Sequence, residues 1–331
     1  MDSMRQFAQN ESIDAIAVVG EKATALSEAL VRHASGHEED RCYLMLDPAL
    51  RNGLGALQAV MAAYGEGAAL DVCPIRVALP RDYARKRWPL LVRLPALSTY
   101  PGSELSRHAL QMAVDDWRVD SLREGSGHRV CAWLFSRHDL PRVAGHLGRW
   151  AVHRRQDGRR TLIRFWDPAV MDQLWAVSTM AQRSSFLGPV SSWAWLDRWS
   201  ALATQSASKT TSPEPPPVYT SEQWARLDHI GPINRLWVKA RAEGIALTRE
   251  HMVSVEHALQ RADAAGINDP DDLLQYAWRA VSVASDFDSH PTIRALLAAR
   301  ESGQAFSYVV SDLDKEDWRR IAEESASLPA A

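Results

Sequence analysis

The sequence predicts an α/β (α+β) N-terminal lobe with a mixed sheet, followed by an all-α C-terminal lobe. Before residue 203, short apolar runs typical of strands alternate with helical patterns, which indicates an α/β lobe. After residue 218 the pattern changes to amphipathic helices with recognisable starts. The chain has 331 residues, of which 46% are hydrophobic, and this is enough for a real core in one large domain or in two ordinary ones.

The N-terminal lobe is predicted to span residues 1–203. Its strand-like runs include 42–47, 90–94, 130–135 and 161–166. Its helical patterns lie at 54–65, 104–122 and 139–149. This alternation of strands and helices along the chain indicates an α/β lobe.

A hairpin turn is predicted at residues 155–159, because Asp157-Gly158 easily supplies the positive backbone angles of a tight connection. The flanking strands are expected at 149–155 and 160–166. The second strand ends at Asp167-Pro168, where Asp167 suits the N-cap of a helix and Pro168 its first position. A strand is therefore expected to lead directly into a helix at this point.

Residues 204–218 predict a linker, because Ser, Thr and Pro dominate and the run 213–217 disfavours both helix and strand. The helical lobe is then expected over residues 219–331. Its predicted helix starts are a capping box of Thr220 and Gln223, then Thr248, Asp269-Pro270, His290-Pro291, and Asp314 or a neighbouring acid.

The composition of the chain indicates its cellular compartment and the classes of partner to expect. The formal net charge of −3 gives no global electrostatic reason to expect nucleic acid or an acidic membrane as a partner. Cys42, Cys73 and Cys131 stand far apart in mostly apolar settings, which suits reduced thiols and a cytoplasmic protein. Neither a signal peptide nor a membrane span is expected, because the required apolar runs are missing from the sequence.

The sequence predicts no catalytic, metal-binding or cofactor-binding residue. His33 and His37 are spaced to share a helical face, but further ligands are missing, and a solvated pair is the favoured interpretation. The alternative function is a hydrolytic enzyme or toxin that uses His138 or His146 with a nearby acid. No serine lies in a nucleophile elbow to support it.

Tryptophan and arginine supply the candidate partner-binding residues, because both types dominate recognition patches. The chain has 13 tryptophans, and some of them are expected to fill the seam between the lobes. An arginine cluster surrounds the predicted hairpin, where a solvated face is favoured over an anionic partner, and nucleic acid is a further alternative. The candidates are Trp193, Trp195, Trp199, Arg155, Arg159, Arg160, Trp224 and Trp237.

Several short motifs resemble one known family in their order and spacing. Residues 43–47 look like the family's opening strand, 88–94 like its central strand, and 133–147 like the next strand and helix. The strongest signature lies in 164–168 and 186–190, where Trp166 stands in place of tyrosine and Leu187 in place of a second phenylalanine. The signature residues are Arg164, Phe165, Trp166, Asp167, Pro168, Gly188 and Pro189.

Residues 41–200 thus resemble the type VI secretion effector-adaptor domain, a domain of unknown function commonly encoded between a VgrG spike protein and a toxic effector. The resemblance implies a cytoplasmic, non-catalytic adaptor or chaperone that binds its cognate effector and loads it onto VgrG. It implies no cofactor, and neither nucleic acid nor membrane as a partner. The signature itself is expected to be mostly structural, with Arg164 paired to a carboxylate and Asp167 capping a helix.

Overall fold

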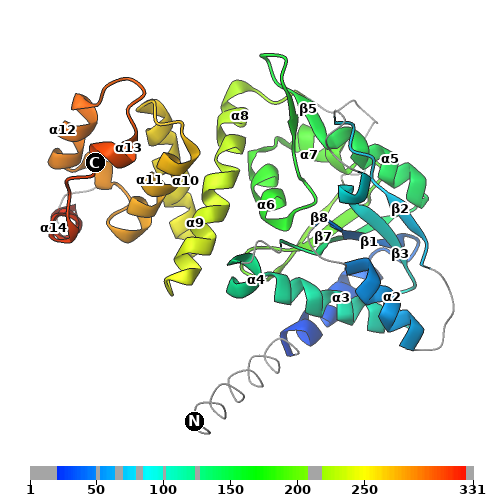
Figure 1. The fold of residues 1–331 in the computed structure, drawn as a ribbon. Coiled ribbons are helices and arrows are strands. Elements are labelled where there is room, and N and C mark those ends of the chain that lie inside the picture. The colour runs from blue at the N-terminus through cyan, green and yellow to red at the C-terminus, as the bar shows by residue number, and fades with distance from the viewer. Residues whose placement is uncertain are drawn as a thin grey trace, which may run out of the picture. The chain divides into compact units, whose positions relative to one another are not determined.

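A computed structural model describes residues 21–49, 53–63, 70–79, 85–99, 102–123, 127–207 and 218–325. The chain divides into two compact units, Met1–Tyr219 and Thr220–Ala331 (Figure 1). The first unit contains a six-stranded sheet with helices, and the second is helical. This confirms the predicted fold class. In the described part of the chain, no helix combines the length and the apolar character needed to cross a bilayer.

The sheet of the first unit has the strand order β2-β3-β1-β4-β7-β8. Its strands are β1 (Arg41–Leu46), β2 (Val72–Pro74), β3 (Leu90–Leu94), β4 (Val130–Ser136), β7 (Ser192–Leu196) and β8 (Leu202–Ser206). Every pair of neighbouring strands in this order is antiparallel, so the prediction of a mixed sheet is corrected to an antiparallel one.

Helices cover both faces of this sheet. All seven residues of β4 and all five of β7 are buried, although successive side chains of a strand point to opposite faces. Figure 1 shows α2 and α3 on one side of the sheet and α5, α6 and α7 on the other. The helices of the first unit are one over residues 21–35, α2 (Gly53–Ala63), the short η1 (Arg85–Arg87), α3 (Gly102–Asp116), α4 (Val119–Arg123), α5 (Leu140–Trp150), α6 (Pro168–Val177) and α7 (Met180–Leu187).

The predicted hairpin is present but shorter than expected. β5 (Val152–Arg154) and β6 (Arg160–Leu162) form a two-stranded antiparallel sheet, and Gly158 in the turn has a φ of +83°. Residues 149–150 belong to α5, so the predicted strand 149–155 began too early. Residues 163–166 are not a strand, because the chain turns there, with the Asp167 amide donating to the Arg164 carbonyl at 2.9 Å.

The predicted linker is only partly described. β8 contains 204–206, which the sequence placed in the linker, because these residues pair with β7 and complete the sheet. Residues 208–217 lie outside the described residues. Tyr219 ends the first unit with 1% of its side chain exposed, and its ring lies 5.1 Å from that of His153. The boundary between the units therefore follows Tyr219.

The second unit has a helix at each of the five predicted starts. In chain order its helices are α8 (Ser221–Asp228), α9 (Ile230–Ala242), α10 (Arg249–Ala264), α11 (Pro270–Ser282), the short η2 (Phe287–Ser289), α12 (Pro291–Ala299), α13 (Phe306–Val309) and α14 (Lys315–Ser325). Of these, α9, η2 and α13 are additional elements that were not predicted. Thr220 and Thr248 each form a capping box, and Asp269 caps α11. The Asp314 carboxylate accepts from the Glu316 and Asp317 amides at 2.8 and 2.9 Å. These local hydrogen bonds fix where each helix begins.

The core of the second unit is aromatic. Tyr276 lies 4.8 Å from Phe287 and 5.0 Å from Phe306, measured between ring centroids. The buried Asp272 carboxylate accepts from the amides of Phe306 and Ser307 at 2.9 and 3.0 Å. This bond satisfies the first amides of α13 and fixes Phe306 against α11.

Candidate functional site

The first half of the signature forms a buried polar cluster around Asp47, at the C-terminal end of β1. Arg164 Nη2 donates to Asp47 Oδ2 at 2.8 Å, and Trp166 Nε1 donates to the same oxygen at 2.9 Å. The other oxygen, Oδ1, accepts from the Ala49 amide at 2.8 Å. Only 2% of Asp47 is exposed, so the carboxylate is held almost entirely by the protein. Asp47 is thus the carboxylate partner predicted for Arg164.

Asp167 extends this cluster to the start of α6. Its Oδ1 accepts from the Ala169 amide at 3.1 Å, which makes Asp167 the N-cap of the helix, as predicted. The His128 Nδ1 donates to the same oxygen at 3.1 Å. Burial opposes ionisation of Asp167, but the bond from His128 and the charge of Arg164 outweigh it and hold the pKa of Asp167 below its usual value. We call Asp47, His128, Arg164, Trp166 and Asp167 the signature cluster.

A second ion pair anchors the signature cluster to α3. Arg129 donates from Nε to Asp116 Oδ1 at 2.7 Å and from Nη2 to Asp115 Oδ2 at 2.7 Å. The Arg129 carbonyl accepts from the Asp47 amide at 3.0 Å. The charged side chains beside the ends of β1, β4 and α6 thus have partners within the protein, and this arrangement stabilises the fold.

The second half of the signature builds an aromatic core. The Phe186 ring lies 5.0 Å from Trp150, 5.2 Å from Trp193, 5.4 Å from Phe165 and 5.9 Å from Trp175. All five side chains are buried, which places them among the largest contributors to the core of this unit. Phe165 and Phe186 are therefore packing residues.

Position 188 requires glycine, because the His146 side chain lies very close to its backbone. Gly188 has a φ of +50°, and a Cβ at this position would lie 2.3 Å from His146 Cε1. The neighbouring Pro189 carbonyl accepts from Ser136 Oγ at 2.6 Å, which ties the loop to β4. The signature therefore fixes this loop by backbone geometry and by one side-chain bond.

Four of the five candidate tryptophans are buried. Trp193 and Trp195 are 1% and 5% exposed on β7, and Trp224 and Trp237 are 5% and 4% exposed in the helical unit. Trp199 is half-buried. The partner-binding interpretation of those four residues is corrected, because a docking protein cannot reach them. The seam interpretation is also corrected for Trp193 and Trp195, which lie in the core of the first unit.

Of the two histidines proposed for hydrolysis, His146 has a ring engaged in other hydrogen bonds. His146 Nε2 donates to the Phe186 carbonyl at 2.7 Å, and Nδ1 accepts from Arg149 Nη2 at 3.2 Å. Burial, opposed by the bond to Phe186 and aided by the charge of Arg149, lowers the pKa of His146. In the described residues no ion pair joins a carboxylate to His138 or His146.

His33 and His37 do not form the expected solvated pair. Their rings lie 5.1 Å apart, and both pack on Phe135, at 5.3 and 5.4 Å. His33 Nε2 lies 2.7 Å from Ser192 Oγ, and His37 Nδ1 lies 3.0 Å from Asp40 Oδ2. Across the described ranges, no three His, Cys, Asp or Glu side chains form a group suited to a metal ion.

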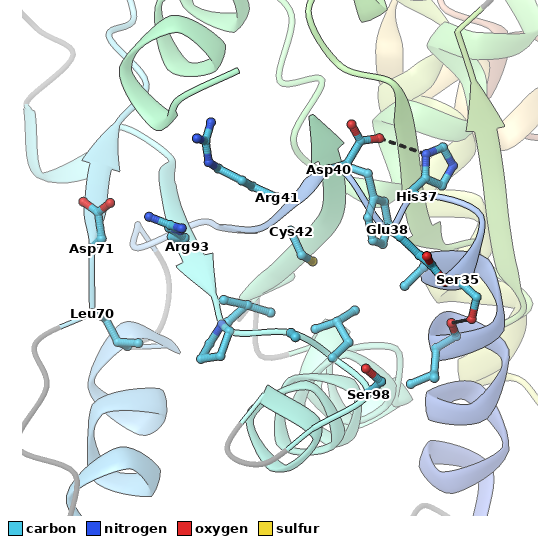
Figure 2. Close-up of a pocket in the computed structure, with 17 residues that line it drawn as sticks. Ser35, His37, Glu38, Asp40, Arg41, Cys42, Leu70, Asp71, Arg93 and Ser98 are labelled. Carbon is cyan, nitrogen blue, oxygen red and sulfur yellow. Dashed lines mark hydrogen bonds and ion pairs between the residues drawn. The ribbon is translucent and has the colours of Figure 1, made fainter. Parts of the chain in front are cut away.

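A hollow of about 800 Å³ lies beside this pair, at the N-terminal end of β1 (Figure 2). Its lining includes Cys42, His37 and Asp40, the residue types of a cysteine nucleophile and its base. Burial raises the pKa of the Cys42 thiol, which keeps the thiol protonated. Figure 2 shows the Cys42 sulfur pointing away from the His37–Asp40 pair. The hollow therefore offers a lining of mixed charge instead of an activated thiol.

A second hollow of about 680 Å³ adjoins the first. Both are lined by Ser35, His37, Glu38 and Asp40, so that segment 35–40 borders both. The second is also lined by Gly188 and Pro189 of the signature. Side chains of both charges therefore line an accessible surface near the N-terminal end of β1.

The candidate arginines of the hairpin lie near or at the surface. Arg155 is half-buried and donates from Nε to Thr161 Oγ1 at 2.9 Å. Arg159 is exposed and pairs with Asp157 at 2.5 Å. Arg160 is exposed and donates to the Ala78 carbonyl. Of the candidates, the arginines and Trp199 are thus the ones that a partner can contact.

His153 makes the stability of the fold depend on pH. Burial, partly offset by the bond from Nε2 to the Trp150 carbonyl, lowers the pKa of His153 to about 4. The unfolded chain takes up this proton at about pH 6.5, so stability is complete above that pH and falls as the pH drops towards 4. We expect the free energy of unfolding to be about 2 kcal/mol lower near pH 5 than near pH 7 because of this group.

Urea denaturation of the His153→Gln variant at both pH values checks this expectation. The variant should lose most of the difference, whereas His251→Gln, at an exposed position, should retain it. Equal pH dependence in the wild type and in His153→Gln would show that His153 is not responsible.

Comparison with known proteins gives a match to a family model. No curated protein and no solved structure matches the chain. Residues 42–185 match the model of a family described as a domain of unknown function, DUF4123. The matched range contains the whole signature cluster, from Asp47 to Asp167. Over residues 42–185 the chain is therefore similar to DUF4123, and the cluster that stabilises its sheet lies inside that region.

Proposed function

We propose that this protein is a non-catalytic adaptor, or chaperone, that binds a type VI secretion effector in the cytoplasm and loads it onto its cognate VgrG spike. The match of residues 42–185 to DUF4123 is the observation that carries the proposal, because it supports the resemblance to the effector-adaptor family. The signature residues have structural roles, so their presence does not require a reaction.

The surface chemistry fits this role. An adaptor needs moderate affinity for two proteins and must release both without forming a covalent bond. The two adjoining hollows provide concave surface with both charges, bordered by Gly188 and Pro189. We place one protein contact there. Burial of the Cys42 thiol and the hydrogen bonds of the His146 ring support a role that uses no reactive group.

Two compact units suggest a division of labour. We propose that the first unit contacts VgrG, because it holds the family-matched region, and that the helical unit distinguishes the effector. Fragments 1–219 and 220–331 test this division in pull-downs, once each shows a cooperative thermal transition. A fragment ending at 205 is unsuitable, because it cuts β8 and removes Tyr219 from the core. Binding of both partners to the same fragment alone would contradict the division.

The test of the function uses the full chain. It is co-expressed with the VgrG and the effector encoded by adjoining genes, and the mixture is separated by size-exclusion chromatography. We expect the adaptor to elute with each partner. Elution of the adaptor alone in both mixtures, or adjoining genes that encode neither partner, would contradict the proposal.

A further inference from the structure

Positive charge is concentrated on one part of the first unit. Residues 140–163, which form α5 and the β5–β6 hairpin, contain six arginines and one acidic residue, Asp157. The whole chain has a net charge of −3, so this segment departs strongly from the average. Such a local excess creates a field that the net charge of the protein does not reveal.

Neighbouring elements bring these arginines together. A Cβ added to Gly148 of α5 would lie 2.7 Å from the Arg76 carbonyl, so the chain after β2 runs directly along α5. Arg160 of β6 donates to the carbonyl of Ala78 in the same stretch. Figure 1 shows α5, β2 and β5 side by side. The five exposed arginines gathered by these elements, here called the basic face, are Arg76, Arg142, Arg149, Arg154 and Arg160.

The basic face is not neutralised by the described residues. Arg149 donates to the Gly145 carbonyl and to His146, and Arg160 donates to a carbonyl, all of which are uncharged acceptors. Within the described ranges, none of the five arginines forms an ion pair with a carboxylate. The nearby acid, Asp157, is paired with Arg159. The guanidinium groups of this surface therefore keep their charge available.

Three of these charges are unfavourable for the fold itself. Arg154 stands directly opposite Arg160 in the β5–β6 ladder, and like charges in opposite positions destabilise a strand pair. Arg142 lies in the first turn of α5, where the helix dipole disfavours a positive charge. The local structure gives no reason for arginine at these exposed positions, whereas an anionic partner does.

We propose that the basic face binds an acidic segment, rich in Asp and Glu, of a protein partner. The inference rests on the proposed function and adds the chemistry of one contact. Guanidinium groups bind carboxylates through paired hydrogen bonds, and rows of them suit a segment with repeated carboxylates. Binding relieves the repulsion between Arg154 and Arg160, because a carboxylate placed between them attracts both.

A polypeptide fits this surface better than a nucleic acid does. Proteins that bind single-stranded nucleic acid combine positive charge with exposed aromatic rings for base stacking. The one aromatic residue of residues 140–163 is Trp150, and it is 1% exposed. The basic face therefore offers carboxylate recognition without a stacking platform.

The test measures binding of the full chain to a labelled peptide of alternating Glu and Gly, by fluorescence anisotropy at low salt. The double variant Arg149→Glu/Arg154→Glu should bind about tenfold more weakly than the wild type. It should also fold, because it places a carboxylate opposite Arg160. The control Lys22→Glu/Arg294→Glu makes the same change of charge at exposed positions elsewhere and should bind like the wild type.

Two results would overturn the inference: equal loss of affinity in both double variants, or tighter binding of a single-stranded DNA of equal charge. The first would show that only net charge matters, and the second would indicate nucleic acid. These failures are distinct from failure of the proposed function. If the peptide does not bind but the adaptor still elutes with VgrG or effector, only the basic face is rejected. If the peptide binds but neither partner co-elutes, the adaptor role is rejected and the acidic-segment contact stands.

Discussion

Replacing Phe186 by alanine is expected to destabilise the first unit by about 3–5 kcal/mol, the usual cost of removing a buried aromatic ring. Phe186 lies between 5.0 and 5.9 Å from four other aromatic rings, contributed by α5, β7, α6 and the turn before α6. Its loss leaves a cavity that rigid neighbours cannot fill. Urea denaturation followed by tryptophan fluorescence measures the change in the free energy of unfolding.

Two further variants make this prediction specific. Phe186→Leu retains much of the buried volume and should cost clearly less than the alanine variant. Tyr308→Ala removes an aromatic ring that is 68% exposed in the helical unit and should leave stability nearly unchanged. Similar costs for Phe186→Ala and Tyr308→Ala would contradict the central packing role of Phe186.

Replacing Asp47 by alanine is expected to cost about 3 kcal/mol of stability. The substitution removes the acceptor of both Arg164 and Trp166, and the Trp166 ring is completely buried. The buried indole N–H of Trp166 then loses the hydrogen-bond acceptor that Asp47 provides. Arg164 is 38% exposed and regains some water, which keeps the cost at the lower end for a broken buried pair.

The Asp47→Asn variant separates charge from hydrogen bonding. An asparagine oxygen can still accept one of these bonds, so its loss of stability should be smaller than that of Asp47→Ala. Arg118→Ala, which breaks an ion pair that is 47% exposed on the arginine side, should cost little. Thermal denaturation ranks the three variants. An Asp47→Ala variant as stable as Arg118→Ala would show that the signature cluster does not stabilise the fold.

The features predicted correctly from the sequence are those fixed by neighbouring residues. Asp167-Pro168 starts α6 because the cap and the helix it caps are adjacent in the chain. Gly158 forms the hairpin turn for the same reason. The helix starts at Thr220 and Thr248 likewise depend on residues within one turn.

The features that were missed depend on residues far apart in sequence. Asp47 and Arg164 are separated by 117 positions, so no local pattern identifies one as the partner of the other. The strand pair β7–β8 was missed because β8 is short and half polar and acquires its structure by pairing with β7. His33 and His37 were assigned to solvent because Phe135, which covers them, belongs to a distant strand.

The tryptophans show that candidate functional residues, too, depend on contacts that a local sequence pattern does not reveal. Trp193 and Trp195 are two positions apart and lie on the same face of β7, and an isolated strand would expose both of them. Helices cover both faces here, so both rings are buried. Which candidate residues reach the surface is decided by tertiary packing, and the accessible set is accordingly the hairpin arginines and the lining of the two hollows.

Delivery of the effector by living cells tests the proposed function most directly. The measurement compares the amount of cognate effector in the culture medium of cells with and without the gene for this protein, with VgrG in the medium as the control. We predict that deletion removes the effector from the medium while VgrG is still released, and that the restored gene recovers delivery. Unchanged release of the effector after deletion would contradict the adaptor role.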